Sequence, residues 1–348
     1  MVEQTQPPKH QDSFDFHRHL SDVLDGSPYH IKSLTGGVSG AGVFLITNGS
    51  ERLVIKNAGG IGSREIKAKQ LIKNYLPTPP IKGSGENHFI QPLVPGETVE
   101  TAVSIKGNVD PFKLFATQFA RLWEETWTQE LQPEGYTDKV EDTISMVLQT
   151  KIKDHLNQPV LLGNVANYMM LVNGKSVGTL ETGLRNMSAV ICDSQKSTVV
   201  THGDEGAGNA LIVPDGSLVY IDYETAGMRR VQEPIAKVLL YFIVTKSSDK
   251  GYELVVNHAE RQIYLNVNTK LSSHVRKAID LARKEFDAWF VSPYLRQVAA
   301  GFMMMYLFRE FQHAAKRGRN HMIPHLLGMA MSFVPGIDGH HYLYPISK

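Results

Sequence analysis

Cysteine is nearly absent from this chain: among its 348 residues, Cys192 is the only one. A single thiol excludes a disulfide within the chain, and sparse cysteine is typical of proteins from a reducing compartment. We therefore expect a cytoplasmic location. The apolar core of a signal peptide is also missing, because residues 1–18 are polar, and we expect residues 1–12 to be mobile.

Long hydrophobic runs and an excess of charge of one sign are absent as well. The apolar run at residues 238–244 is far too short to span a bilayer. The formal net charge is only +1 and no long basic run occurs, so the sequence favours neither nucleic acid nor a membrane as a partner. The 14 histidines show no metal-ligand spacing.

The composition is that of an ordinary globular protein, with 42% hydrophobic and 20% charged residues. Because 348 residues are many for one domain, we expect two lobes, residues 1–95 and residues 96–348. The sequence contains no internal repeat, and it does not indicate an oligomeric state.

The most informative segment is residues 201–209, Thr-His-Gly-Asp-Glu-Gly-Ala-Gly-Asn, which follows a run rich in β-branched residues. Two apolar runs come next, at residues 210–213 and 218–222, on either side of Pro-Asp-Gly-Ser. The Asp-Gly step predicts a hairpin. The far strand of this hairpin would bring Asp222 back beside Asn209.

Three side chains of this arrangement carry chemistry. Asp204 is a candidate base, and Asn209 and Asp222 are candidate ligands of Mg²⁺. Phosphoryl transfer from a nucleotide requires an oriented hydroxyl and metal ions held against the phosphates, and this set of residues meets both requirements. A polar turn followed by a plain hairpin is the alternative for His-Gly-Asp alone, but the joint match in type, order and spacing favours phosphoryl transfer.

These residues resemble the catalytic and metal-binding loops of the aminoglycoside phosphotransferase-like kinases, a group that includes choline, fructosamine and methylthioribose kinases. The resemblance rests on His202-Gly-Asp204, four further residues, Asn209, and then Ile221-Asp222. It implies an α+β, two-lobed protein-kinase-like fold, with a small antiparallel β-sheet and one helix in the N-terminal lobe and a larger, mainly helical C-terminal lobe. It also implies that Asp204 is the catalytic base and that Asn209 and Asp222 hold magnesium.

The sequence departs from the family pattern at two points. Glu205 follows the base, where the family usually has an apolar residue. Gly-Ala-Gly precedes Asn209, where a His-Pro pair is common. Neither change removes a ligand, but both bear on how the acceptor is positioned.

The resemblance requires a phosphate-covering loop and a lysine upstream, and the sequence supplies both. A glycine-rich turn separates apolar runs at residues 29–34 and 43–47, and its backbone amides can approach phosphate oxygens, although a plain β-turn is the alternative. No Gly-Lys-Ser/Thr follows, so this is not a Walker A loop. By the resemblance, Lys56 at the end of the next strand contacts the phosphates. The turn residues assigned to nucleotide binding are Gly36, Gly37, Val38, Ser39 and Gly40.

A helix is expected at residues 63–74, where Ser63 can cap the start and Glu65 lies in the first turn. By the resemblance, Glu65 pairs with Lys56, and a solvated acid at the helix start is the alternative. Residues 88–97 resemble the last strand of the small lobe and the hinge, where adenine lies against the backbone. The hinge residues assigned to the nucleotide are Gln91 and Leu93.

The C-terminal lobe is predicted to be mainly helical, because its apolar residues recur at helical spacing. Ser272 and Ser273 can cap one of these helices. The methionine-rich run at residues 302–308 is expected to be core rather than a ligand site. The predicted helices cover residues 111–123, 137–153, 178–191, 274–290, 294–316 and 323–333.

The chemical class of the acceptor is left open by the sequence. Glu205 and Glu224 would favour a cationic acceptor such as an aminoglycoside or choline. Arg229 and Arg230 would favour an anionic acceptor. Solvated surface charge is the commoner role for all four residues.

The sequence therefore predicts a small-molecule kinase that uses Mg²⁺ and transfers the γ-phosphate of ATP or GTP to a hydroxyl of an antibiotic, sugar or amino-alcohol acceptor. Two alternatives share the fold. A protein kinase is disfavoured because Gly203 replaces the arginine that normally follows the catalytic histidine, and no Asp-Phe-Gly signature occurs. A nucleotide-binding pseudokinase or interaction protein is disfavoured because Asp204, Asn209 and Asp222 are all present.

Overall fold

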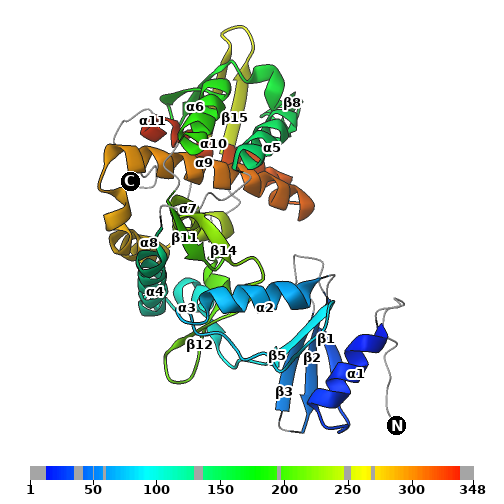
Figure 1. The fold of residues 1–348 in the computed structure, drawn as a ribbon. Helices are drawn as coiled ribbons and strands as arrows, with labels where there is room; N and C mark the ends of the chain where they lie inside the picture. The colour runs from blue at the N-terminus through cyan, green and yellow to red at the C-terminus, as the bar shows by residue number, and fades with distance from the viewer. Residues whose placement is uncertain are drawn as a thin grey trace. The chain divides into compact units, whose positions relative to one another are not determined.

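The computed structural model describes residues 13–34, 42–49, 51–57, 60–128, 136–193, 197–246, 252–267 and 271–337. The chain forms two compact units. The first unit contains Met1–Val99, Val200–Asp204 and Gly208–Gly227, and the second contains Glu100–Val199, Glu205–Ala207 and Met228–Lys348. The fold is α+β, as the sequence predicted (Figure 1).

A five-stranded antiparallel sheet is the main element of the first unit. Its strand order is β1-β2-β3-β5-β4, and every neighbouring pair is antiparallel. The predicted small antiparallel sheet is therefore confirmed. Its strands are β1 (His30–Leu34), β2 (Gly42–Asn48), β3 (Glu51–Asn57), β4 (Gly83–Ser84) and β5 (His88–Pro92).

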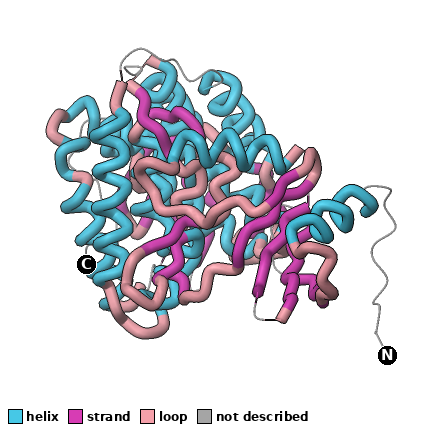
Figure 2. Tube along the Cα trace, turned by 60° about the horizontal axis from the view of Figure 1, so that its bottom comes forward, coloured by secondary structure: helices cyan, strands magenta, loops and turns pink. Residues whose placement is uncertain are grey.

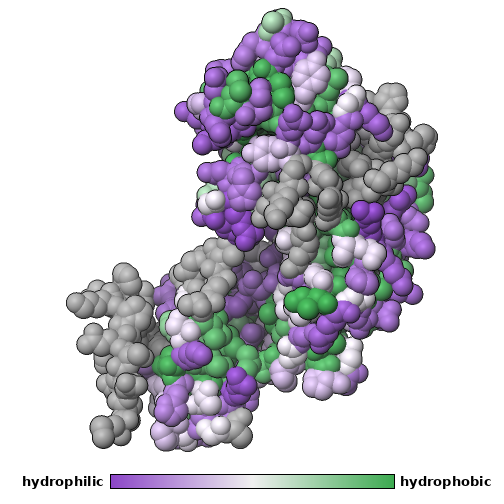
Figure 3. Space-filling model, turned by 180° about the vertical axis from the view of Figure 1, so that it is seen from behind, coloured by the Kyte–Doolittle hydropathy of each residue, from purple (hydrophilic) through white to green (hydrophobic). Residues whose placement is uncertain are grey.

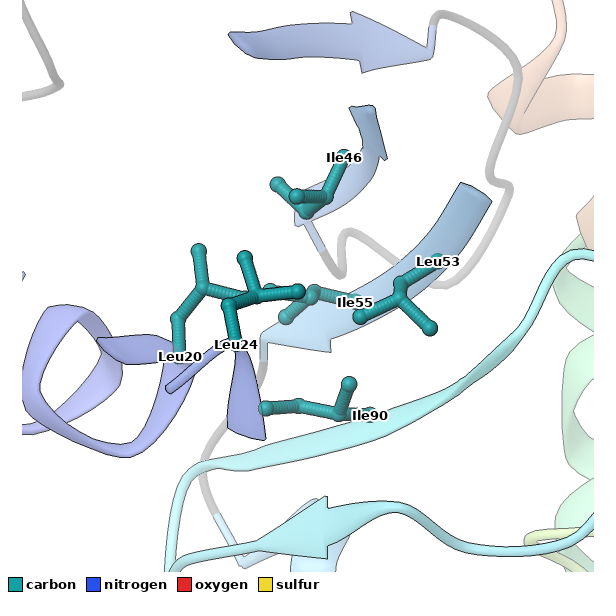
Figure 4. Packing of buried hydrophobic residues seen from close by; sticks show 6 residues of the cluster. All are labelled: Leu20, Leu24, Ile46, Leu53, Ile55 and Ile90. Atoms are coloured by element: carbon teal, nitrogen blue, oxygen red, sulfur yellow. The ribbon is translucent and has the colours of Figure 1, made fainter. Parts of the chain in front are cut away.

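Helix α1 (Ser13–Val23), which the sequence analysis did not predict, packs on this sheet. Leucines at its C-terminal end meet leucine and isoleucine side chains from β2, β3 and β5 (Figure 4). Burial of each such side chain contributes about 1.5–3 kcal/mol, so the cluster holds the helix to the sheet. Its members are Leu20, Leu24, Ile46, Leu53, Ile55 and Ile90.

Helix α2 (Ile61–Ile72) begins two residues earlier than predicted. Its N-cap is Gly60, whose φ of 67° lies in the left-handed region that favours glycine. The expected cap by Ser63 is wrong, because the Ser63 hydroxyl donates a hydrogen bond to the carbonyl oxygen of Gly60 (3.2 Å) instead of accepting one from the helix. Glu65 consequently lies beyond the first turn and is buried.

A second, three-stranded sheet of the first unit contains the predicted hairpin. The strand order is β13-β12-β6, with β6 (Glu97–Thr98), β12 (Ala210–Ile212) and β13 (Leu218–Tyr220). The Asp-Gly turn closes the hairpin, because Oδ1 of Asp215 accepts hydrogen bonds from the backbone N–H (2.9 Å) and the hydroxyl (2.7 Å) of Ser217. The hairpin prediction is confirmed.

The second unit is mainly helical (Figure 2). Helix α9 lies at its centre and contacts α6, α7, α10 and α11, while α4 contacts α8. The methionines at 303–305 on α9 are buried, so the methionine-rich run is core, as predicted. The helices from residue 99 onward are α3 (Val99–Ser104), α4 (Asp110–Thr126), α5 (Tyr136–Gln149), α6 (Leu180–Cys192), α7 (Gln232–Lys246), α8 (Ser273–Glu285), α9 (Pro293–Lys316), α10 (Ile323–Met331) and α11 (Val334–Ile337).

The second unit also contains strands that the sequence analysis missed. A four-stranded sheet has the order β10-β9-β16-β15, and β16 runs parallel to β9. A separate pair, β7 and β8, follows α5. β11 and β14 form a further pair, and β11 coincides with the run rich in β-branched residues that precedes His202. The bounds are β7 (Lys151–Lys153), β8 (Pro159–Leu161), β9 (Met169–Val172), β10 (Lys175–Thr179), β11 (Thr198–Thr201), β14 (Gly227–Arg230), β15 (Tyr252–Asn257) and β16 (Gln262–Val267).

Two predicted helices end earlier than expected. The helix predicted for residues 137–153 ends at Gln149, because the next residues pair with β8. The helix predicted for residues 274–290 ends at Glu285 and is followed by a short 3₁₀ turn, Asp287–Phe290. The cap at its start is confirmed, since the Ser272 hydroxyl accepts a hydrogen bond from the backbone N–H of Val275 over 3.3 Å.

Exposed apolar residues are scattered over the surface among hydrophilic ones (Figure 3). Ile105, Leu156 and Val291 are the most exposed large apolar side chains of the described residues. Isolated exposed apolar residues are normal on folded proteins. None of the helices in the described ranges combines the length and the hydrophobicity that a membrane span needs.

Candidate active site

The His-Gly-Asp segment forms a closely packed turn after β11. His202 is fully buried, and the centroid of its ring lies 6.0 Å from that of Tyr220 and 6.4 Å from that of Tyr223. Gly203 has a φ of 91°, and a Cβ atom on it would lie 2.1 Å from the carbonyl oxygen of Thr225. Only glycine fits this position. The glycine that distinguishes the chain from protein kinases is therefore required by the backbone.

Asp204 follows this turn, is exposed, and is held in place by Asn209. Nδ2 of Asn209 donates hydrogen bonds to Oδ2 of Asp204 over 2.9 Å and to the carbonyl oxygen of Asp204 over 3.2 Å. A metal ion would bind the amide oxygen of an asparagine and not its nitrogen. The observed hydrogen bonds are thus compatible with Asn209 acting as a metal ligand.

Asp222 stands next to this pair at the end of the hairpin. The backbone N–H of Ile221 donates to the carbonyl oxygen of Asn209 over 2.9 Å, which fixes the chain just before Asp222. The φ of Asp222 is 63°, in the left-handed region. A non-glycine residue in this region costs roughly 1 kcal/mol or more, and such residues concentrate at functional sites.

Lys56 bridges two carboxylates that are distant in sequence. Its Nζ lies 3.2 Å from Oε1 of Glu65 and 2.6 Å from Oδ1 of Asp222. The side chain of Glu65 is completely buried, whereas that of Asp222 is 47% exposed. The ion pair between Lys56 and Glu65 that the resemblance implied is present. The alternative, a solvated acid at the helix start, is wrong.

The titration behaviour of this group reflects its burial and its charges. Burial alone would lower the pKa of Lys56, but the carboxylates of Asp222 and Glu65 outweigh it and the pKa is raised. The pKa of Glu65 is raised by burial, although Lys56 opposes the shift; Glu224 and Asp222 add to it. Each carboxylate therefore disfavours the negative charge of its neighbours.

Glu224 is a part of the site that the sequence did not assign to the metal. Carboxylate oxygens of Glu65, Asp222 and Glu224 lie within 4.8 Å of one another. With Lys56 they carry a formal charge of −2, which favours a divalent cation, and carboxylate oxygens are the ligands that Mg²⁺ prefers. Oε2 of Glu65 is buried without a hydrogen-bond partner among the described atoms. The sequence signal for Glu224 was its place two residues after Asp222.

The residues assigned to the nucleotide lie on or next to β5 of the five-stranded sheet, or outside the described residues. The five turn residues from Gly36 to Gly40 lie outside them. They fall in the sequence between β1 and β2, and Val43 at the start of β2 is paired with Lys56. Gln91 is buried in β5, paired with Val54. Leu93 follows the strand and donates its N–H to the carbonyl oxygen of Arg52 over 2.8 Å.

The four charges considered for the acceptor do not behave as solvated surface groups. Glu205 is only 1% exposed, and its Oε2 lies 3.7 Å from Nζ of Lys237. Arg229 is half-buried and lies 3.0 Å from Glu233. Arg230 is 4% exposed and donates to a backbone carbonyl oxygen of α6. Glu205 therefore has a positive partner within the protein.

Comparison with known proteins gives a likeness of fold. No protein-family model matches the chain, and no curated protein matches its sequence. Among solved structures, aminoglycoside phosphotransferase APH(4)-Ia is 13% identical and has a TM-score of 0.57, with 92% of this chain and 98% of that one covered. Choline kinase LicA from Streptococcus pneumoniae is 9% identical, with a TM-score of 0.52 and coverages of 91% and 98%.

A third structure, spectinomycin phosphotransferase APH(9)-Ia in complex with ADP and spectinomycin, is 10% identical with a TM-score of 0.52. Its alignment covers 92% of this chain and 98% of that one. The chain therefore has the two-lobed protein-kinase-like fold of aminoglycoside phosphotransferases and choline kinases. At these identities the likeness concerns the fold, and the chemistry must be argued from the residues.

Proposed function

We propose that this protein is a small-molecule kinase, which transfers the γ-phosphate of ATP or GTP to a hydroxyl of an antibiotic, a sugar or an amino alcohol. In this proposal residues 1–95 are the nucleotide-binding lobe, and residues 96–348 supply catalysis and acceptor binding. Structural neighbours include phosphotransferases and a choline kinase, one of them with bound ADP, which supports a nucleotide as the donor.

The observation that carries the proposal is the assembly of one reactive set within the first unit. Asp204, Asn209, Asp222, Lys56 and Glu65 come from four separate stretches of sequence. Phosphoryl transfer depends on positioning and on neutralising phosphate charge, and this set contains groups for both tasks. This chemistry uses an exposed carboxylate, an amide oxygen, further carboxylates and a lysine, and the set supplies each of them.

Each residue has a distinct role in the proposed reaction. Asp204 accepts or orients the proton of the acceptor hydroxyl, and Asn209 holds the Asp204 carboxylate through its amide nitrogen. Mg²⁺, when bound by Asn209 and Asp222, would neutralise negative charge on the phosphates. Lys56 is held by buried Glu65 and contacts phosphate oxygens.

Glu224 is a further metal ligand in this proposal, because its carboxylate lies in the same acidic group as that of Asp222. The turn from Gly36 to Gly40 covers the phosphates, and Gln91 and Leu93 lie along the nucleotide base. These nucleotide contacts follow from the resemblance of the motifs and remain predictions.

A measurement of ADP release tests the proposal against its main alternative. When hydroxylated compounds are supplied, a kinase converts MgATP to ADP, or MgGTP to GDP, only if one of these compounds is an acceptor. A pseudokinase of the same fold is thermally stabilised by MgATP but shows no turnover across a wide acceptor panel. The intact Asp204, Asn209 and Asp222 favour the kinase.

A further inference from the structure

A cavity of about 260 Å³ lies wholly within the second unit. Its lining comes from α7, α8, α9 and the 3₁₀ turn that joins α8 to α9, and these elements pack against one another. The volume is just below the usual range of ligand pockets, roughly 300 Å³ upward, so the cavity suits a small molecule. The lining residues used below are Leu239, Asp287, Phe290, Val291, Arg296 and Met303.

The buried part of this lining is apolar. Leu239 on α7, Phe290 at the end of the 3₁₀ turn and Met303 on α9 are all buried. Val291 also lines the cavity and is 74% exposed, so it adds apolar surface on the solvent side. An apolar group placed here would leave water and contact apolar side chains from three elements, which is favourable. The cavity therefore favours a ligand with an apolar part.

Two side chains of opposite charge line the same cavity without pairing. Arg296, in the first turns of α9, is half-buried, and Asp287, at the start of the 3₁₀ turn, is exposed. Within the described ranges, neither side chain has an ion-pair or hydrogen-bond partner. A half-buried guanidinium has lost part of its hydration, and nothing in the described chain replaces it. Both charged groups are thus available to a ligand.

Each part of this lining selects a chemical group. A guanidinium matches the two oxygens of a carboxylate, and a carboxylate accepts hydrogen bonds from an ammonium group. A simple acid would leave Asp287 without a partner, and a simple amine would leave Arg296 without one. Arg283 on α8 lines the cavity as well, but it already has a partner of its own.

We propose that this cavity binds a free α-amino acid with an apolar side chain. Arg296 holds the carboxylate of the ligand and Asp287 holds its ammonium group. The side chain of the ligand packs against Leu239, Phe290 and Met303. Binding here does not require the proposed kinase reaction, so the two proposals can be tested separately.

Calorimetric titration of the full chain without nucleotide tests this proposal with L-leucine and L-phenylalanine. Each has an analogue without the carboxylate, isoamylamine or phenethylamine, and an analogue without the amine, isocaproate or hydrocinnamate. Glycine lacks the side chain. At least one of the two amino acids should bind about tenfold more tightly than glycine and than both of its own analogues, because hydrogen bonds to charged groups are the stronger ones.

Two variants remove the charged partners one at a time. Arg296→Gln should abolish the preference for the amino acid over its amine analogue and keep the preference over its acid analogue. Asp287→Asn should do the reverse. The matched controls are Arg276→Gln and Asp280→Asn, which remove exposed charges on α8 outside the cavity lining and should behave like the wild type. Circular dichroism checks that each variant is folded.

Three results would overturn the inference. Neither amino acid binds more tightly than its analogues, or a variant of the cavity behaves like its control, or both variants weaken every ligand alike, as a purely structural effect would. Failure of the kinase proposal looks different. Amino-acid binding that depends on Arg296 and Asp287, without ADP release from any acceptor, would refute the kinase proposal and leave this site standing. ADP release without amino-acid binding would do the reverse.

Discussion

Replacement of Glu233 by glutamine should lower the free energy of unfolding by about 3 kcal/mol at pH 7. Burial alone would raise the pKa of this carboxyl group, but the charges of Lys237, Arg229 and Lys139 and the hydrogen bond from Tyr136 outweigh it, and the pKa falls from 4.5 to about 2. One pKa unit corresponds to about 1.36 kcal/mol, so the shift is worth roughly 3 kcal/mol.

The pH dependence of this stabilisation has a definite sign. A carboxyl group with a lower pKa in the folded state adds stability above its unfolded pKa, and the contribution is lost as the pH falls. For Glu233 the window runs from 4.5 down to about 2. The glutamine variant cannot titrate, so the difference between the two proteins should shrink across this window.

Urea denaturation followed by circular dichroism at pH 7, 5, 4 and 3 measures this difference. Glu124→Gln, on the exposed side of α4, is the control and should stay within about 0.5 kcal/mol of the wild type. A loss below about 1 kcal/mol for Glu233→Gln at pH 7, or a loss that does not change with pH, would refute the electrostatic reasoning.

Three further substitutions test other parts of the account. Asp222→Ala should abolish the Mg²⁺-dependent part of ATP binding in calorimetry, and an unchanged dependence would place the metal elsewhere. Gly203→Ala should lower the free energy of unfolding by more than about 1 kcal/mol, because its Cβ would meet the carbonyl oxygen of Thr225 at 2.1 Å; a urea midpoint equal to wild type would contradict this. Glu205→Gln should cost roughly 1–3 kcal/mol through the loss of its pairing with Lys237, and an unchanged thermal midpoint would show that this pairing does not stabilise the fold.

The sequence predicted the fold and the hairpin because their signals are local. The Asp-Gly step fixed the turn between β12 and β13, and the order of His202, Asp204 and Asn209 indicated the kinase-like fold before any contact was known. The small sheet was expected from the resemblance that these motifs carry. Patterns of this kind lie within short stretches of sequence, so they can be recognised without knowing any long-range contact.

The elements that the sequence missed depend on partners far along the chain. The strand at Lys151–Lys153 was predicted as the end of a helix, and its pairing with Pro159–Leu161 overrides local helix propensity. The sheet joining β9 to β16 pairs segments about 90 residues apart, and a parallel pairing leaves no turn signal. Local sequence patterns also do not predict that Glu205 pairs with Lys237 on α7.

The start of α2 was misplaced for a different reason. Glycine at position 60 adopts a left-handed conformation as the N-cap, whereas serine is the commoner cap and drew the prediction to Ser63. The shift of two residues matters for the site, because it moves Glu65 out of the first turn and into the buried layer beside Lys56.

Acceptor-dependent ADP release by the wild type and by Asp204→Asn tests the central claim most directly. Asparagine can still accept the hydrogen bond that Asn209 donates to Asp204, so the variant should keep its fold and its affinity for MgATP. Turnover should fall by a factor on the order of 10² or more, because the group that accepts the hydroxyl proton is gone. Two results would contradict the account. In the first, the variant turns over within about threefold of the wild type. In the second, the wild type shows no acceptor-dependent ADP release with any aminoglycoside, sugar, sugar acid or amino alcohol.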